Sequence, residues 1–154
     1  MKVATLCYCL RDGEVLLGMK KEGFGMDKWN GFGGKVEPDE EVEAAARREL
    51  EEESGLTVTR DGIKKAAVVS FYFGDAPIFE CHVFLAGSWR GESRESGEMR
   101  PQWFSVQSLP YSEMWPSDLY WLPAVLQGHT LSAVCHFDIE GTVVQKFEMT
   151  RTTF

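Results

Sequence analysis

The hydrophobic positions of the chain fall into short runs of the kind that form β-strands, with turn residues between them. Runs at 3–10 and 14–20 flank Asp12-Gly13, a pair that favours a tight hairpin turn. Runs of similar length recur along the rest of the chain, at 63–73, 78–86, 102–106, 131–137 and 142–150. Glycine-containing turns separate the first two and the last two of these runs, which indicates two further antiparallel hairpins.

Two segments have a helical pattern instead. Residues 40–53 are rich in helix formers, Pro38-Asp39 can begin and cap a helix, and Gly55 can end one in the left-handed conformation. Residues 118–127 give a second helix. Many strands and two helices in mixed order predict an α+β fold, with helices flanking a mixed central β-sheet in an α/β/α layered arrangement. The length predicts a single domain, residues 1–154.

The acidic residues of the first helix are placed unusually. At about 100° per residue, three carboxylates fall within about one third of the helix circumference, those of Glu49, Glu52 and Glu53. Three apolar residues share that side, Val42, Ala45 and Ala46. Glu40 is expected on the opposite side, with the residues that face solvent. A solvated acidic face is the usual alternative for a charge-rich helix, but it does not explain acids on the side that packs inward.

Carboxylates crowded on a packing face repel one another, and their desolvation is costly without a counter-charge. A hard divalent cation removes both difficulties, because Mg²⁺ prefers oxygen ligands and shares its coordination shell with water and substrate phosphates. The helix therefore predicts a metal-binding acidic cluster, which suits chemistry on a phosphorylated ligand.

The overall charge limits the partners. A net charge of −8 opposes a partner held by phosphate backbone contacts, such as duplex DNA, although a few lysines and bound cations can still attract a small anion. No apolar run is long enough to cross a bilayer. The four cysteines lack metal-ligand spacing and are expected to be buried free thiols in a reducing compartment. We therefore expect a cytoplasmic monomer without a nucleic-acid or membrane partner.

A defined sequence motif spans the first helix. Every defined position of the Nudix box (G-x5-E-x7-R-E-U-x-E-E-x-G-U, where U is aliphatic) is matched, by Gly34, Glu40, Arg48-Glu49-Leu50, Glu52-Glu53 and Gly55-Leu56. The sequence thus resembles the Nudix hydrolase family. The resemblance implies a Nudix sandwich with a loop–helix–loop motif. It also implies Mg²⁺-dependent hydrolysis of a nucleoside diphosphate linked to another moiety, with Mn²⁺ as a substitute metal.

The resemblance also implies roles for the residues of the box. The metal ligands would be the carbonyl of Gly34 and the side chains of Glu49, Glu52, Glu53 and Glu98. Arg48 would orient a glutamate through a charge-assisted hydrogen bond. The metal would polarise phosphoryl oxygens and activate a water molecule. Glu53 and the loop residue Glu98 are both candidates for the general base, and the sequence does not decide between them.

The similarity extends beyond the box to the animal MutT homologues, which hydrolyse oxidised purine nucleoside triphosphates such as 8-oxo-dGTP to the monophosphate and pyrophosphate. Such enzymes sanitise the nucleotide pool and so avoid DNA damage. The similarity rests on four segments, 16–21, 29–36, 98–101 and 114–116. It implies a nucleotide pocket lined by Thr5, Lys20, Asn30, Phe32, Gly33, Gly34, Lys35, Trp115, Pro116, Ser117 and Asp118.

The chemistry of these side chains suits a purine base. Asn30 can donate and accept hydrogen bonds along a purine edge, and Asp118 can accept them from purine N–H groups. Trp115 offers a stacking surface, typically worth about 1–3 kcal/mol per base. Phe71 and Phe73 share one face of a strand and would form either an apolar wall of the pocket or part of the core.

One position departs from the animal enzymes, which have two adjacent acids after Trp-Pro where this chain has Ser117-Asp118. A neutral hydroxyl replaces one carboxylate. We therefore expect activity on oxidised guanine nucleotides without the same breadth toward oxidised adenine. Two alternatives remain, a Nudix diphosphatase of broader specificity and a non-catalytic nucleotide sensor. A role in RNA processing is disfavoured, because the chain has no basic stripe.

Overall fold

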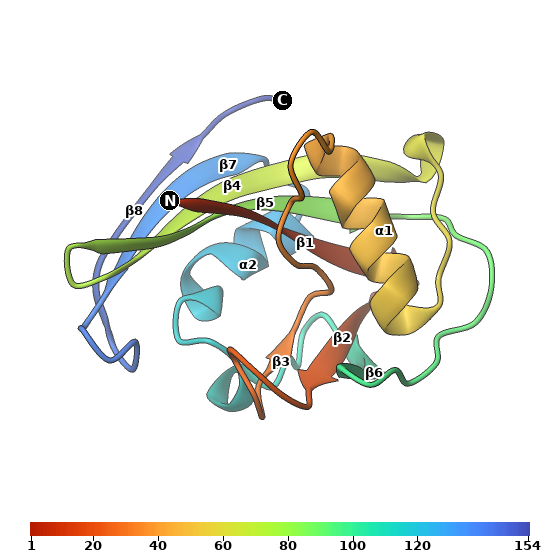
Figure 1. Cartoon of the computed structure of the whole chain (residues 1–154), viewed down its shortest axis with the longest axis horizontal. Coiled ribbons are helices and arrows are strands. Elements are labelled where there is room, and N and C mark those ends of the chain that lie inside the picture. The colour runs from red at the N-terminus through yellow and green to blue at the C-terminus, as the bar shows by residue number, and fades with distance from the viewer.

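Eight strands and two helices make up the chain in the computed structural model, which describes residues 1–154 (Figure 1). The strands are β1 (Lys2–Arg11), β2 (Glu14–Lys20), β3 (Trp29–Asn30), β4 (Ile63–Phe73), β5 (Ala76–Ala86), β6 (Met99–Ser105), β7 (Leu131–Phe137) and β8 (Val144–Arg151). The helices are α1 (Val42–Ser54) and α2 (Asp118–Leu126), and short 3-10 turns lie at Arg60–Gly62 and Tyr111–Glu113.

The strands form one mixed sheet in the order β3-β2-β1-β5-β4-β7-β8, and β6 pairs with β2. The pairs β1–β5 and β4–β7 are parallel, whereas the other pairs are antiparallel. The predicted hairpin between β1 and β2 is confirmed. Asp12 and Gly13 both have positive φ, at 45° and 78°, as a tight turn between twisted strands requires.

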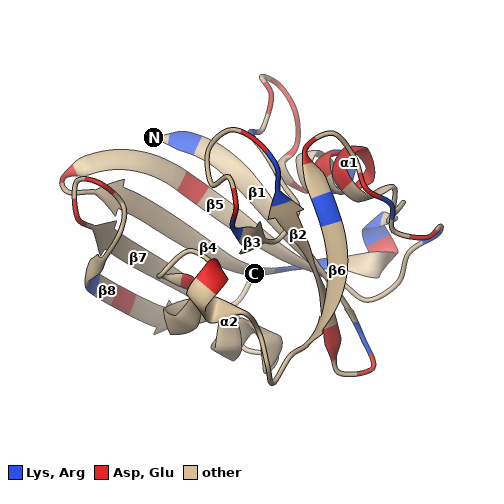
Figure 2. Ribbon diagram, turned by 90° about the horizontal axis from the view of Figure 1, so that it is seen from below, with Lys and Arg blue, Asp and Glu red and all other residues tan.

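The helices cover opposite faces of the sheet, as Figures 1 and 2 show. Side chains alternate along a strand, so β1 sends Cys7 and Cys9 toward α1 and Tyr8 toward α2. Leu50 of α1 anchors one hydrophobic core, and Trp121 of α2 anchors the other. The predicted α/β/α layering around a mixed sheet is confirmed.

The start of α1 differs from the prediction. The helix begins at Val42 instead of residue 40, with Glu41 as its N-cap, while Gly55 ends it at φ 80° as expected. Asp39 has a φ of 63°, so Pro38-Asp39 forms a turn and not the first helical turn. Glu40 therefore lies before the helix. Its expected place on the solvent side was wrong, because its carboxylate accepts hydrogen bonds from Arg48.

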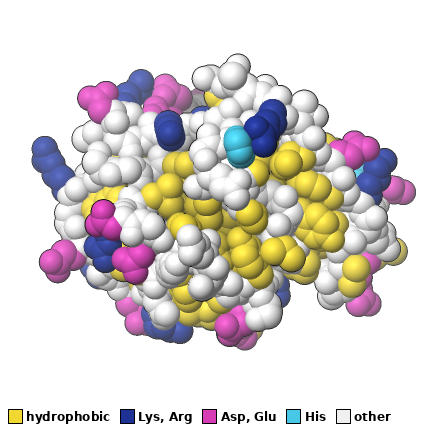
Figure 3. Space-filling model, turned by 180° about the vertical axis from the view of Figure 1, so that it is seen from behind, with side chains coloured by type: hydrophobic (Ala, Val, Ile, Leu, Met, Phe, Trp, Pro, Cys, Tyr) yellow, Lys and Arg dark blue, Asp and Glu magenta, His cyan; other side chains and the backbone are white.

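The surface is not uniformly polar. Hydrophobic side chains gather over the middle of the back of the molecule, with charged side chains around them (Figure 3). Leu119 and Tyr120 of α2 are among the exposed large apolar residues. Neither helix combines the length and the apolar character that a membrane-spanning helix needs. The four cysteines are buried and unpaired, as expected from their spacing.

Candidate active site

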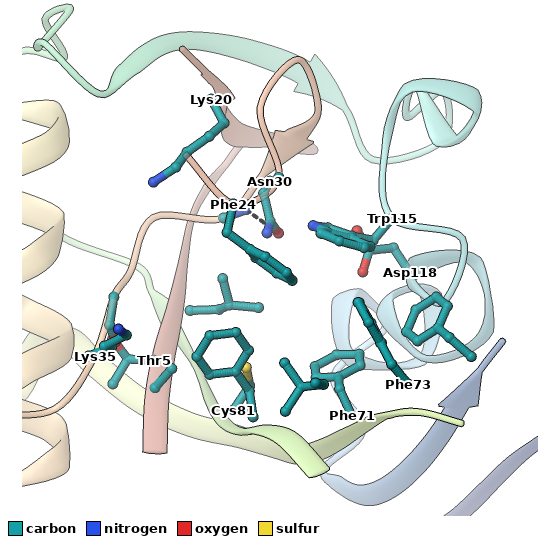
Figure 4. Close-up of a pocket in the computed structure, with 18 of the residues that line it drawn as sticks. Thr5, Lys20, Phe24, Asn30, Lys35, Phe71, Phe73, Cys81, Trp115 and Asp118 are labelled. Atoms are coloured by element: carbon teal, nitrogen blue, oxygen red, sulfur yellow. Dashed lines mark hydrogen bonds between the residues drawn. The ribbon is translucent and has the colours of Figure 1, made fainter. Parts of the chain in front are cut away.

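A cavity of about 250 Å³ lies between the sheet and the start of α2 (Figure 4). Its lining is mostly apolar and comes from β1, β2, β4 and β5, from the glycine-rich segment at 23–34, and from the segment that leads into α2. A largely apolar pocket with a few polar groups is the usual form of a site for a small organic ligand.

Most of the residues expected in the nucleotide pocket do line this cavity, namely Thr5, Lys20, Asn30, Gly34, Lys35, Phe71, Phe73, Trp115 and Asp118. They come from distant parts of the sequence, and the sheet brings them together. Phe71 and Phe73 belong to the cavity wall, although Phe71 also packs against the core on the α2 side. Asp118 is the first residue of α2 and is buried.

Four residues expected in the pocket lie outside its lining. Phe32 is wholly buried on the α1 side of the sheet, beside Met99, so its predicted place was wrong. It pairs with Cys7, whose side chain faces the same way, and the alternation of side chains therefore turns Phe32 away from the cavity. Pro116 is partly buried and Ser117 is fully buried. The backbone N–H of Gly33 points to Glu53 instead.

Several lining residues were not predicted from the sequence, and these are Ala4, Leu6, Phe24, Gly25, Gly31, Ile78, Phe79, Cys81, Met99 and Phe137. Strand pairing explains Phe79, which lies opposite Phe71 in the β4–β5 register. The alternation within β5 then adds Cys81 to the same face. A search for the residue paired with Phe71 could have found Phe79, and the alternation of side chains could then have found Cys81.

Phe24 is the most exposed of these additions, at 55 %. It lies between Gly23 and Gly25, which have φ of 76° and 82° and so adopt a left-handed conformation that suits glycine. Its ring stacks on that of Trp115, with centroids 5.0 Å apart and an angle of 23° between the planes. Phe24 therefore covers one face of the indole on which a base was expected to stack (Figure 4).

Asn30 and Asp118 are two of the polar residues that line the cavity, together with Thr5, Lys20 and Lys35. The Oδ1 atom of Asn30 accepts a hydrogen bond from the N–H of Gly31 at 2.8 Å and from the hydroxyl of Tyr8 at 3.3 Å. The amide oxygen is thus used within the protein, which leaves the N–H groups of Asn30 for a ligand. Burial raises the pKa of Asp118 to about 8, and its Oδ2 atom has no hydrogen-bond partner.

The acidic residues of α1 lie next to this cavity. Glu53 is only 3 % exposed and accepts a hydrogen bond from the N–H of Gly33 at 2.9 Å. Burial raises the pKa of Glu53 to about 8, and the neighbouring Glu49 and Glu98 raise it further. Burial also raises the pKa of Glu49, with contributions from the charges of Glu52 and Glu98. The acids therefore crowd together as the sequence predicted.

Two glycines make this approach possible. A Cβ at Gly33 would lie 1.7 Å from the carbonyl oxygen of Thr5, and a Cβ at Gly34 would lie 2.7 Å from the Glu49 carboxyl carbon. A side chain at Gly33 would push the segment away from β1, and one at Gly34 would displace the carboxylate of Glu49. The glycine pair thus keeps the backbone within hydrogen-bond reach of Glu53, while the carbonyl of Gly34 accepts a hydrogen bond from the N–H of Thr5 at 2.9 Å.

Arg48 holds the acidic side chains in place. Its Nε and Nη2 atoms donate to the two carboxylate oxygens of Glu40, at 2.7 and 3.0 Å. Its Nη1 atom donates to Glu49 at 2.9 Å and to Glu52 at 3.3 Å. The expected role of Arg48 in orienting a glutamate matches this geometry, and its partner Glu40 was not foreseen.

The donor set suits a hard divalent cation, because it contains only oxygen atoms and two carboxyl groups whose charged form is disfavoured. No group of three or more acidic, histidine or cysteine side chains is already arranged around one metal position. Glu49 and Glu52 are turned toward Arg48, and Glu98 pairs with Lys20 at 3.6 Å. Metal binding therefore requires rotation of these flexible side chains.

Comparisons with known proteins agree with this site. The family profile described as NUDIX domain matches residues 1–125. A zebrafish (Danio rerio) protein called oxidized purine nucleoside triphosphate hydrolase is 52% identical over 145 residues, which cover 94% of this chain and 92% of that protein. The mouse (Mus musculus) protein of the same name is 44% identical over 144 residues, covering 93% and 91%.

The fold has a close structural counterpart as well. The crystal structure of a mutator MutT protein from Bacillus halodurans superimposes with a TM-score of 0.84 and covers 97% of both chains. The two sequences are only 22% identical, so this likeness concerns the fold alone.

Proposed function

The chain belongs to the Nudix hydrolase family, and from this premise we propose that it hydrolyses oxidised purine nucleoside triphosphates to the monophosphate and pyrophosphate, with Mg²⁺ as the metal. One observation carries the proposal: the acidic cluster on α1 lies next to an apolar cavity large enough for a base. Lys20 lies where they meet, since it lines the cavity and pairs with Glu98, a loop acid that neighbours Glu53. A nucleotide can therefore place its base in the cavity and its phosphates at the acids.

The residues around the phosphates would act in distinct ways. Mg²⁺ held by the carbonyl of Gly34 and by Glu49, Glu52, Glu53 and Glu98 would polarise phosphoryl oxygens and lower the pKa of a bound water. Lys20 and Lys35 would offset phosphate charge. Arg48 gathers Glu49 and Glu52 close to one another, and from there their carboxylates would turn toward the metal.

Proton transfer falls to one of two neighbouring acids. Glu53 is buried and Glu98 is exposed, and the two lie close enough for a hydrogen bond between them to raise the pKa of Glu53. Either could accept the proton of the attacking water as the new P–O bond forms and pyrophosphate leaves. The burial of Glu53 and its bond to Gly33 support Glu53 as the better-positioned base.

The chain would act as one domain. Residues from β1 to α2 contribute to the same site, which supports a single functional unit over residues 1–154. We infer a cytoplasmic monomer, and the four unpaired cysteines support a reducing compartment. Size-exclusion chromatography with light scattering would test the monomer directly.

The test is pyrophosphate release with Mg²⁺ from 8-oxo-dGTP, 2-oxo-dATP, dGTP and dATP, by wild type, Glu53→Gln and Glu51→Gln. Glu51 lies on the exposed side of the same helix and is the matched control. We expect a strong preference for an oxidised purine that Glu53→Gln abolishes and Glu51→Gln leaves intact. Equal activity on all four nucleotides would favour the broader diphosphatase, and nucleotide binding without turnover would favour a sensor.

A further inference from the structure

The side-chain amide of Asn30 is held in one orientation (Figure 4). The oxygen and nitrogen of an amide are alike in shape, so the neighbouring groups decide which is which. The backbone N–H of Gly31 lies 2.8 Å from one of them and can only donate, so this atom is the oxygen. The Tyr8 hydroxyl donates to the same oxygen at 3.3 Å.

Tyr8 is firmly placed for this contact. Its side chain is fully buried on the α2 side of β1, and its ring meets the ring of Trp121 edge-on at 6.2 Å. The ring also lies against Gly31, where a Cβ would come within 2.7 Å of it. Burial, and secondly the charge of Asp118, raises the pKa of Tyr8 well above its ordinary value. The hydroxyl therefore keeps its proton and remains a donor.

The two bonds leave Asn30 with one chemical role toward a ligand. A carbonyl-type oxygen has two lone pairs, and Gly31 and Tyr8 occupy both. Asn30 lines the cavity, and its remaining polar group is the Nδ2 amino group, which can only donate. A ligand atom facing it must be an acceptor. An amino group on the ligand would instead place two buried donors opposite each other, with no acceptor for either.

We propose that Tyr8 is a positioning residue for base selection, which fixes the Asn30 amide as a hydrogen-bond donor and so favours a purine with a carbonyl oxygen at this point. Tyr8 does not line the cavity and so acts through Asn30. The inference rests on the proposed function and narrows its substrate class. An oxidised guanine carries a carbonyl at C6 where 2-oxo-adenine carries an amino group, so the oxidised guanine nucleotide is favoured.

The first test measures kcat and KM for 8-oxo-dGTP and 2-oxo-dATP with wild type, Tyr8→Phe and the control Tyr120→Phe. Tyr120 is half-exposed on α2, and its hydroxyl makes no protein hydrogen bond. We expect Tyr8→Phe to raise KM for 8-oxo-dGTP and to lower the preference for it roughly fivefold, the usual worth of one neutral hydrogen bond. The kcat should stay the same, because the hydroxyl bonds only to Asn30.

A second test separates positioning from packing. In an Asn30→Ala background the substitution Tyr8→Phe should no longer change the preference, since residues that act through one another are not additive. Asn30→Asp provides an independent variant in which Tyr8 is intact and the donor is gone, and it should lose the preference as well. The same loss from Tyr8→Phe with and without Asn30 would show a general packing effect and overturn the inference.

Different results would contradict the role of Tyr8 and the proposed function. An active wild type whose preference is unchanged in Tyr8→Phe would overturn the role of Tyr8 and leave the proposed function standing. A wild type that neither hydrolyses nor binds either oxidised nucleotide would overturn the proposed function, and the inference about Tyr8 would fall with it.

Discussion

At the scale of single residues, the cavity contains a buried acid, Asp118, that has no basic partner. The titratable side chains influenced by the charge of Asp118 are Tyr8, Tyr111, Cys81 and Cys135, and burial raises the pKa of each one. All four are therefore neutral at physiological pH. Only the neighbouring Trp121 favours the charged form of Asp118, and burial outweighs it, so the carboxyl group is protonated over most of the neutral range and can donate a hydrogen bond as well as accept one.

This protonation makes the stability of the protein depend on pH. The pKa of Asp118 rises from 3.8 to about 8 on folding, so between these values the folded chain holds a proton that the unfolded chain has released. Raising the pH through this window therefore lowers stability. Asp118→Asn removes the titration. The free energy of unfolding of the variant, relative to that of wild type, should therefore increase by about 1 kcal/mol or more between pH 5 and pH 8.

Urea denaturation of both proteins at several pH values would measure the difference. Asp138→Asn is a suitable control, because the hydrogen bond from Thr142 lowers the pKa of Asp138 and its ionisation does not change above pH 5. The stability difference for this control should be flat between pH 5 and pH 8. A flat difference for Asp118→Asn as well would contradict the buried, protonated carboxyl.

At the scale of elements, α1 and the arginine within it organise the acidic cluster. The fork of Arg48 joins the segment before the helix, through Glu40, to Glu49 and Glu52 on the helix itself. Lysine keeps the charge but has a single ammonium group, which cannot span these positions. Arg48→Lys should therefore lower kcat/KM by about 10- to 100-fold, the usual cost when groups that orient metal ligands are lost.

The matched control is Arg60→Lys, since Arg60 and its partner Glu41 are both well exposed and such pairs contribute little. Titration of activity with Mg²⁺ should show a weaker apparent metal affinity for Arg48→Lys than for this control. Identical curves for the two variants would mean that Arg48 does not organise the acids.

Most elements could be predicted from the sequence because their cause is local. Three local signals act within a few residues: the alternation along strands, the Asp12-Gly13 turn and Gly55. They predicted the strands and the end of α1. The beginning of α1 was misplaced because the left-handed Asp39 is set by the turn around it. The two-residue strand β3 was missed, since it exists only by pairing with β2 and has no periodicity of its own.

The site was predictable where chemistry is carried by spacing along one helix, and less so where the fold brings residues together. The Nudix box predicted the grouping of Glu49 and Glu53, and the structure has both next to the glycine pair that borders the cavity. The place of Phe32 was inferred from similarity, whereas its pairing with Cys7 turns it into the core. Phe24 reaches Trp115 only because its loop contains left-handed glycines, a property that hydrophobic patterns do not reveal.

At the scale of the whole molecule, the excess of acids links metal binding to stability. The net charge is −8, and burial already disfavours the charged forms of Glu49 and Glu53 at the edge of the cavity. Folding thus brings together groups that repel one another in the absence of a cation. A cation that binds only the folded chain must stabilise it, by about 2.7 kcal/mol when its concentration is 100 times its Kd.

In thermal unfolding experiments, increasing Mg²⁺ should therefore raise the Tm, by about 5–11 °C for a stabilisation of this size. A general screening of the −8 charge would also raise it, so NaCl at matched ionic strength is the necessary comparison. If the site is specific, Mg²⁺ should raise the Tm more than NaCl does in wild type and in Glu51→Gln. This difference between the two salts should disappear in Glu53→Gln. Equal shifts from both salts would show that the acids bind no particular ion, and would remove the metal from the proposed chemistry.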